Sequence, residues 1–166
     1  RWIGYSDFTA FQLALLARTG ARSFAGPALA ADFGAAQPDP FMLAQCQALL
    51  AGHAPEVEWV AEHDDGCVPA GEGVDGVLWG GNLSLVAALV GTPYLPQVDG
   101  GLLFIEDVAE HPYRIERMLH QLLHAGVLAR QRALLLGGFT EWKPAPHDNG
   151  FDLHAVVDYF RGRLPG

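Results

Sequence analysis

The clearest pattern of hydrophobic and polar positions runs from Pro112 to Ala125. Its apolar side chains follow the three- and four-residue spacing of one helix face, and most of its polar side chains fall on the opposite face. Gly126 follows directly, and glycine commonly ends a helix. The segment therefore predicts an amphipathic helix with one buried side, formed by Ile115, Met118, Leu119, Leu122 and Leu123.

Similar spacing predicts four further helices. The first runs from Phe8 to Thr19 and stops at Gly20. A second opens at Asp39-Pro40 and runs to about Leu50, because proline is suited to the first helical turn. The other two are expected over residues 83–90 and 153–163.

Short apolar runs between these helices predict strands. One strand ends at residue 3, and others cover residues 77–79, 101–108 and 133–136. Alternating charged and apolar residues also indicate a half-buried strand over Glu56 to Trp59. Strands that alternate with helices are typical of the α/β class, with parallel pairing. We therefore expect an α/β fold with mixed sheets flanked by helices.

Composition narrows the classes of function. Half of the 166 residues are hydrophobic and 17% are charged, as in globular domains. The formal net charge of −9 argues against a nucleic acid or an anionic membrane as partner, since both require a basic face. No apolar run approaches the roughly 20 residues that span a membrane, and no secretory signal is visible. Cys46 and Cys67 are too few for a disulfide scaffold, so we expect both to be reduced, as in the cytoplasm.

Ser6 lies between a strand end and a helix, in the stretch WIGYSDFTA. A serine nucleophile needs such a sharp turn, because the turn exposes its hydroxyl and brings backbone N–H groups near the oxyanion. Gly4 fits a G-x-S-x-G elbow, but Phe8 stands where the second glycine would be. The alternative is that Ser6 or Asp7 caps the following helix, and the local pattern alone favours the cap.

Glu106 and Asp107 end a predicted buried strand, where α/β folds place their sites. Either carboxylate could orient a catalytic histidine, and either could simply be a polar residue after a strand. Gly80-Gly81-Asn82 precedes a helix and could present N–H groups to an anion, or could form a tight turn with Asn82 as helix cap. Asn82-Leu-Ser84 also matches a glycosylation sequon, a match that is common by chance.

Metal binding is not expected. His120 and His124 share one helix face, but Gln121 stands where a zinc protease has its glutamate base, and a solvated helix face explains the pair better. The segment from His63 to Cys67 has metal-ligand residue types, but a hydrophilic turn explains them more simply.

Four segments, in this order, carry a resemblance that the single motifs do not: GYSDFTAFQLAL, GVLWGGNLSLVAALVGTPYLP, LLFIEDVAEHPYRIERMLHQLLHAGVL and LLLGGF. Together they resemble the LD-carboxypeptidase family of serine peptidases, which includes muramoyltetrapeptide carboxypeptidases and microcin C immunity peptidases. The resemblance covers nearly the whole chain. It implies the end of a Rossmann-like, nucleophile-bearing N-terminal domain over residues 1–36 and much of a C-terminal α/β domain over residues 37–166.

The resemblance also implies roles for individual residues. Ser6 is the expected nucleophile, the backbone N–H of Asp7 is expected to form part of the oxyanion hole, and Glu106 is the expected triad acid. Asn82 is the expected substrate contact. No metal or organic cofactor is implied.

The third triad member has no counterpart in this chain. In the family, the histidine lies in a Gly-His loop after the helix that here ends near Arg163, and none of the seven histidines has that context. His147 precedes the last helix. The family's Arg-Gly-Gly-Tyr-Gly segment, which completes the oxyanion hole, is also absent. We therefore expect the chain to be an interior part of a longer protein, with the histidine beyond Gly166, and the part alone to be inactive.

The function implied for the longer protein is that of a cytoplasmic, homodimeric serine carboxypeptidase. It would remove the terminal D-Ala from murein tetrapeptide, by cleaving an L,D bond, during cell-wall recycling. The alternatives are an amide hydrolase that acts on a peptidyl-nucleotide, as in the microcin branch, and a binding module that kept the fold but not the activity.

Overall fold

The computed structural model describes residues 2–53, 56–58 and 73–163. By its contacts the chain divides into two compact units, one of residues 1–25 with 75–166 and one of residues 26–74. These contact units do not test the domain division predicted between residues 36 and 37, which stays a prediction.

Two parallel sheets organise the first unit. Strands β1 (Ile3–Gly4) and β2 (Phe24–Ala25) form a small sheet. Strands β3 (Leu78–Asn82), β4 (Gly101–Val108) and β5 (Gln131–Thr140) form a larger one, in that order. Every strand pair in the described residues is parallel, which confirms the α/β class and the parallel pairing.

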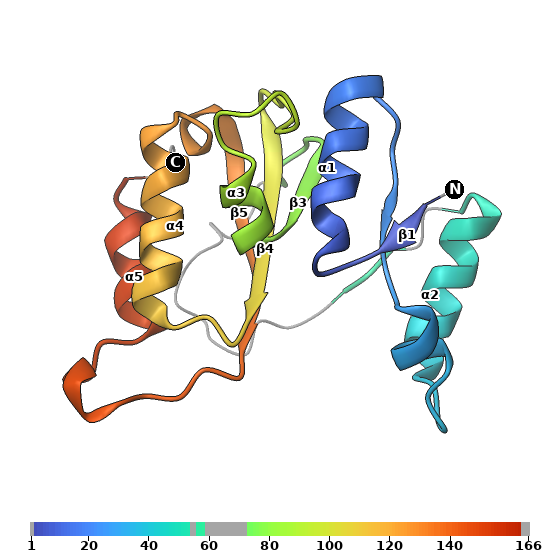
Figure 1. Ribbon diagram of the computed structural model, residues 1–166. Coiled ribbons are helices and arrows are strands. Elements are labelled where there is room, and N and C mark those ends of the chain that lie inside the picture. The colour runs from blue at the N-terminus through green and yellow to red at the C-terminus, as the bar shows by residue number, and fades with distance from the viewer. Residues whose placement is uncertain (1, 54–55, 59–72, 164–166) are drawn as a thin grey trace. The chain divides into compact units, whose positions relative to one another are not determined.

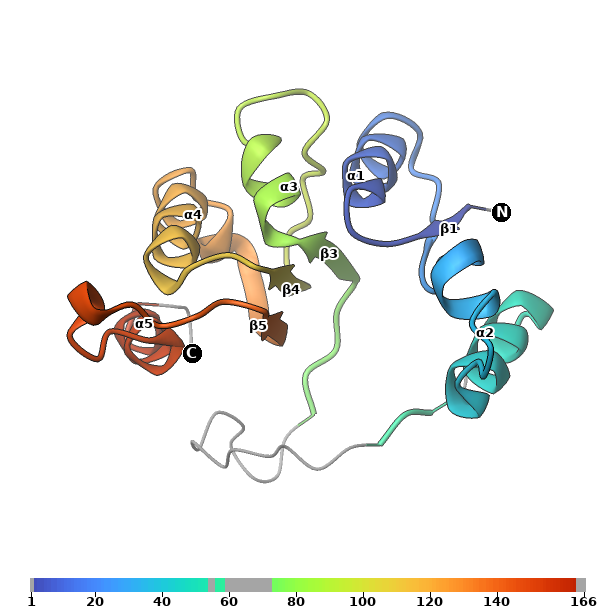
Figure 2. The ribbon, with the colours of Figure 1, turned by 60° about the horizontal axis from the view of Figure 1, so that its bottom comes forward.

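The helices of this unit pack on one face of the larger sheet. They are α1 (Phe8–Thr19), α3 (Leu83–Ala88), α4 (Pro112–His124) and α5 (Leu153–Arg161). Figures 1 and 2 show α3, α4 and α5 along the same side of β3, β4 and β5. Burial alternates along β4, where Leu103 and Ile105 are fully buried towards the helices. The core that results also contains Leu13, Trp79, Leu83, Val86, Ile115, Leu119, Leu122, Val156 and Phe160.

Helix α2 (Pro40–Ala51) and a short π-helical segment, Leu29–Phe33, are the regular elements described in the second unit. Asp39 begins α2 as predicted, because its Oδ1 accepts a hydrogen bond of 2.7 Å from the backbone N–H of Met42. Cys46 is a free, buried thiol on this helix.

The predicted helices agree closely with the structure, whereas the strands differ more. Strand β5 begins two residues earlier and ends four residues later than the apolar run predicts, and so includes Gly137 and Gly138. Strand β3 continues through Gly80 and Gly81. The strand predicted from Glu56 is wrong for the part that the structure describes, because residues 56–58 are exposed and irregular. Trp59, together with the turn from His63 to Cys67, lies outside the described residues. None of the helices described is both long and apolar enough to span a membrane.

Close packing explains why β3 contains two glycines. Gly81 has a φ of +135°, a conformation that L side chains rarely adopt. A Cβ at Gly81 would also lie 2.6 Å from the Thr9 Oγ1 of α1. At Gly80 a Cβ would overlap the backbone oxygen of Phe104 on β4. These glycines therefore allow neighbouring elements to approach closely.

We predict that Gly81→Ala lowers the free energy of unfolding by about 2–4 kcal/mol, from backbone strain together with overpacking against Thr9. Gly91→Ala is the matched control, because Gly91 has a φ of +81° but nothing within 4 Å of an added Cβ. It should cost only about 1–2 kcal/mol, from strain alone. Urea denaturation of both variants measures the difference, and equal losses would contradict the packing argument.

Candidate functional site

Ser6 adopts a strained backbone conformation at the turn between β1 and α1. Its φ is +58°, which is uncommon for any residue other than glycine. The turn is closed by the backbone N–H of Phe8, which donates to the Tyr5 oxygen at 3.2 Å, and by that of Thr9, which donates to the Ser6 oxygen at 2.9 Å. This strand-turn-helix geometry with a left-handed serine is the one that a nucleophile elbow requires.

The alternative interpretation, a capping side chain, is wrong. Asp7 is the residue at the helix cap, yet its side chain makes no capping hydrogen bond. Within the described residues, no hydrogen bond fixes the Ser6 side chain either. The Ser6 hydroxyl is therefore available for another role.

Phe8 explains why the elbow lacks its second glycine. The Phe8 ring packs directly on Gly4, where an added Cβ would overlap the ring. Phe8 also contacts Phe11, with ring centroids 5.0 Å apart. Gly4 thus supplies the small residue that the turn needs, and the Phe8 ring fills the space where a side chain at position 4 would lie.

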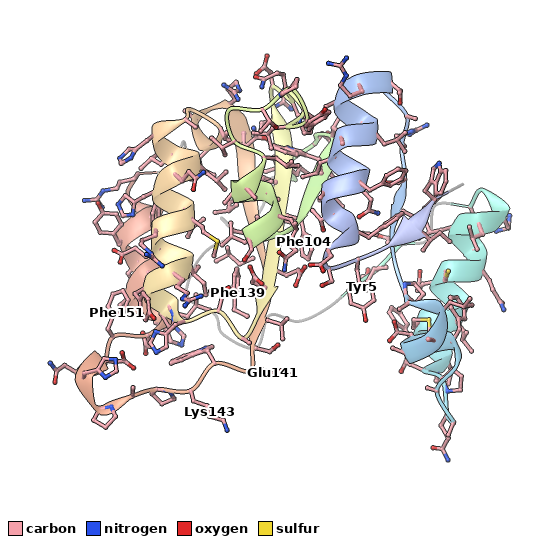
Figure 3. The ribbon with its side chains drawn as sticks, viewed as in Figure 1. Tyr5, Phe104, Phe139, Glu141, Lys143 and Phe151 are labelled. Carbon is pink, nitrogen blue, oxygen red and sulfur yellow. The ribbon has the colours of Figure 1, made fainter. Side chains whose placement is uncertain are left out.

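Strained residues gather where strands end. Ala109 follows β4 with a φ of +61°, and Glu141 follows β5 with a φ of +62°. With Ser6, these make three of the four non-glycine residues with positive φ in the described chain, the fourth being Asn149. Figures 1 and 3 show the turn before α1, marked by Tyr5, and the residues after β5, marked by Glu141 and Lys143, towards the same end of this unit. Such strain is often found at functional sites.

The structure distinguishes the two carboxylates at the end of β4. Asp107 is buried, and its oxygens accept hydrogen bonds from the Asn82 side chain at 2.8 Å and from the Ser84 hydroxyl and N–H at 2.7 and 3.0 Å. The N–H of Val108 donates a fourth, at 2.9 Å. Asp107 therefore joins β4 to the start of α3, and its oxygens are already occupied by the protein's own donors.

Glu106 lies on the other face of the strand and is half-buried. No hydrogen bond to its side chain occurs within the described residues. Burial raises the pKa of Glu106, and the neighbouring Asp107 carboxylate raises it further. Of the two acids, Glu106 is the one free to accept a hydrogen bond from a histidine.

Asn82 begins α3 as its cap, as one of the two interpretations of the Gly-Gly-Asn segment predicted. Its Oδ1 accepts a hydrogen bond of 3.2 Å from the backbone N–H of Leu85, and its own backbone N–H donates to Thr9 Oγ1 at 3.1 Å. The Asp107 carboxylate takes the place at this helix start that an external anion would occupy. Because Asn82 is buried and bonded, the sequon is closed to glycosylation in this fold, and a contact of Asn82 with substrate stays a prediction.

The histidines do not form a metal site in the part of the chain that the structure describes. His124 is exposed, as a solvated face predicts, but His120 is half-buried. The ring nitrogens of His120 lie 3.0 Å from the Glu116 oxygen and 3.2 Å from the Tyr159 hydroxyl on α5. His147 is exposed, in the connection between β5 and α5, with its Nε2 3.7 Å from an oxygen of Asp148.

Sequence reasoning missed Thr9 and Ser84. Both are short hydroxyl side chains within predicted helices, and nothing in the periodicity separates them from other helix residues. The only signal was indirect: Gly81 requires a close neighbour, but the sequence does not say which.

Residues 75–165 match a family model described as the LD-carboxypeptidase C-terminal domain. The chain belongs to the LD-carboxypeptidase family. This membership confirms the resemblance inferred from the four sequence segments.

Individual relatives agree with this family. The Bacillus subtilis protein named "Probable murein peptide carboxypeptidase" is 35% identical over 159 residues, which is 93% of this chain and 48% of that protein. A crystal structure of muramoyltetrapeptide carboxypeptidase from Oxalobacter formigenes matches with a TM-score of 0.85 and 42% identity, over 98% of this chain and 54% of the other. The microcin C7 self-immunity protein MccF of Escherichia coli is 30% identical over 81% of this chain and 46% of its own length. The chain thus spans about half the length of these LD-carboxypeptidase relatives.

We predict that Glu106→Gln raises the melting temperature at pH 7. A raised pKa means that the ionised carboxylate destabilises the fold at any pH above that pKa, and the neutral amide removes this cost. The gain should disappear as the pH falls to about 3, more than one unit below the ordinary glutamate pKa of about 4.3, where glutamate is protonated in the folded and unfolded states alike. Glu110→Gln is the control: Glu110 pairs with Arg114 at 3.6 Å on the surface, so its loss should give no gain at pH 7. A melting temperature of Glu106→Gln that is lower at pH 7 would contradict the prediction.

Proposed function

We propose that the full-length gene product is a serine-type carboxypeptidase that removes the terminal D-Ala from murein tetrapeptide. The observation that carries the proposal is the left-handed conformation of Ser6 at the turn into α1. The accessible Glu106 at the end of β4 and the names of the murein relatives support it. The expected setting, a cytoplasmic homodimer that recycles cell wall, belongs to the same proposal.

The proposed chemistry is acyl transfer in two steps. The Ser6 Oγ attacks the carbonyl carbon of the L,D bond while a histidine takes its proton, and the oxyanion that forms accepts a hydrogen bond from the N–H of Asp7. The histidine then donates that proton to the nitrogen of D-Ala as the C–N bond breaks. Water attacks the acyl-enzyme and releases the shortened peptide. Glu106 orients the histidine, which we place outside residues 1–166.

The raised pKa of Glu106 is compatible with this role. A carboxylate that is costly to keep ionised gains most from a nearby imidazolium, which forms each time the histidine takes a proton. The same acid next to no cation only destabilises the fold. The raised pKa of Glu106 therefore supports a functional role for this acid more than a structural one.

Ser6→Ala in the full-length protein should lower the rate of D-Ala release at least about 1,000-fold, because the members of a triad act as a unit. A fluorophosphonate probe should label the wild-type protein at Ser6 and leave the variant unlabelled. Ser23→Ala is the control, since Ser23 lies in the loop before β2, and it should behave as wild type. Full activity of Ser6→Ala would refute the assignment of the nucleophile.

The identity to MccF supports a second candidate, hydrolysis of a peptidyl-nucleotide amide. The same preparation can be assayed with an aminoacyl sulfamoyl adenosine and with murein tetrapeptide. The higher identity to the murein enzymes leads us to expect the larger kcat/KM for the tetrapeptide. If neither substrate is cleaved and Ser6 is not labelled, a binding module of the same fold becomes the better hypothesis.

A further inference from the structure

Thr9 connects the turn that carries Ser6 to the end of β3, where Asn82 lies. It lies in the first turn of α1, three residues after Ser6, and its side chain is 1% exposed. Its backbone N–H donates to the backbone carbonyl oxygen of Ser6 at 2.9 Å, while its Oγ1 accepts from the backbone N–H of Asn82 at 3.1 Å. Thr9 thus bonds to both parts of the candidate site, although Asn82 lies 73 residues after it along the chain.

The connection continues to the end of β4. The Asn82 side chain donates to Asp107 at 2.8 Å, and Asp107 directly follows Glu106. A series of hydrogen bonds therefore runs from the nucleophile turn to the strand end with the proposed triad acid, and the two bonds made by Asn82 in this series are buried. Buried hydrogen bonds of this kind hold their partners firmly, because a partner left unpaired cannot turn to water.

Steric contact fixes the same connection a second time. A Cβ at Gly81 would lie 2.6 Å from Thr9 Oγ1 and 3.0 Å from Thr9 Cγ2, so both branches of the threonine side chain press against the Gly81 backbone. The hydroxyl sets the hydrogen bond, and the methyl group fills the space beside it. α1 cannot approach β3 here without steric overlap, and it cannot withdraw without losing these contacts.

We propose that Thr9 is a positioning residue, which sets the place of Ser6 relative to Asn82 and Glu106 through its hydroxyl. The proposal rests on the proposed function, since it assumes that Ser6 is the nucleophile. Thr9 itself contacts neither substrate nor reacting atoms. A displacement of about 1 Å between a nucleophile and its partners can cost about 100-fold in rate, so a side chain that holds this separation affects catalysis from outside the reacting atoms.

The test separates the hydroxyl from the methyl group. In the full-length protein, Thr9→Val keeps the shape but leaves the Asn82 N–H without its acceptor, and Thr9→Ser keeps the acceptor. We expect Thr9→Val to lower kcat for D-Ala release about 10- to 100-fold, with KM changed less than about threefold. Thr9→Ser should restore kcat to within about threefold of wild type. The rate at which a fluorophosphonate labels Ser6 should follow kcat.

Thr92→Val is the matched control. The Thr92 hydroxyl donates to the Leu89 oxygen at 2.7 Å, after α3 and so away from the carboxyl ends of the strands. Thr92 Oγ1 also accepts from the backbone N–H of Tyr94 at 3.2 Å, so this variant loses two hydrogen bonds of the hydroxyl, at least as many as Thr9→Val, but should keep the wild-type kcat. A general loss of stability would therefore lower the melting temperature of both variants without separating their kcat values.

Amide hydrogen exchange gives a result that needs no substrate. In Thr9→Val, exchange should become faster in peptides covering residues 4–13 and 78–86, and in Thr9→Ser it should stay as in wild type. Faster exchange together with slower labelling of Ser6 in Thr9→Val supports the positioning role, even if the wild-type protein releases no D-Ala. Absence of D-Ala release from the wild type would refute only the proposed substrate. Wild-type exchange, labelling and kcat in Thr9→Val would overturn the inference, as would a Thr9→Ser variant that is as impaired as Thr9→Val.

Discussion

The hydrogen bonds to the buried carboxylate of Asp107 are the constraint on which the rest of the site depends. A charge removed from water is costly unless donors replace the solvent, and Asp107 has donors from Asn82, from Ser84 and from the backbone of Val108. These donors come from two different elements, so satisfying the charge also fixes the start of α3 against the end of β4. The same arrangement leaves Glu106 on the other face with no partner in the described residues and with a raised pKa. The oxygens of one acid are thereby satisfied by the protein's own donors, whereas no hydrogen bond to the side chain of its neighbour occurs in the described residues.

Glycines at this end of the sheet allow neighbouring strands and helices to pack closely, and they do not form turns. Thr9 packs where a Gly81 side chain would be, and the backbone of Phe104 packs against Gly80. On the next strand, a Cβ at Gly137 would lie 2.7 Å from the Phe104 ring and 3.1 Å from the Glu106 Cβ. Two Gly-Gly pairs that look like loop signals in the sequence are therefore parts of strands. They leave room for the side chains on which the candidate site depends.

Local patterns predicted the elements well and the site only in part. The bounds of α1 and β4 follow from periodicity and end signals within the segment, and the structure agrees with both. The left-handed backbone of Ser6 could not be predicted in the same way, because Ser6-Asp7 before a helix is also a good capping sequence. Only the motifs far from Ser6 along the chain favoured a nucleophile over a cap. The local pattern could not separate Glu106 from Asp107, since their environments depend on Asn82 and Ser84, more than 20 residues earlier, and only the family resemblance distinguished them. The same limit applies to Thr9, whose partner is 73 residues away.

Strained backbone conformations also occur at this end of the unit, where the strands end. Ser6, Ala109 and Glu141 each hold a positive φ just after a strand, and such conformations persist only where surrounding contacts enforce them. At Ser6 the enforcing contacts include the Thr9 N–H and the Phe8 ring on Gly4. At Ala109 the backbone N–H donates to the Thr140 oxygen at 2.8 Å, which ties the exit of β4 to the end of β5. The energy that folding supplies through the helix-covered core is thus partly used to hold three strand exits in conformations that the residues would not adopt alone. A preorganised site needs that property, because its groups must not relax when substrate binds.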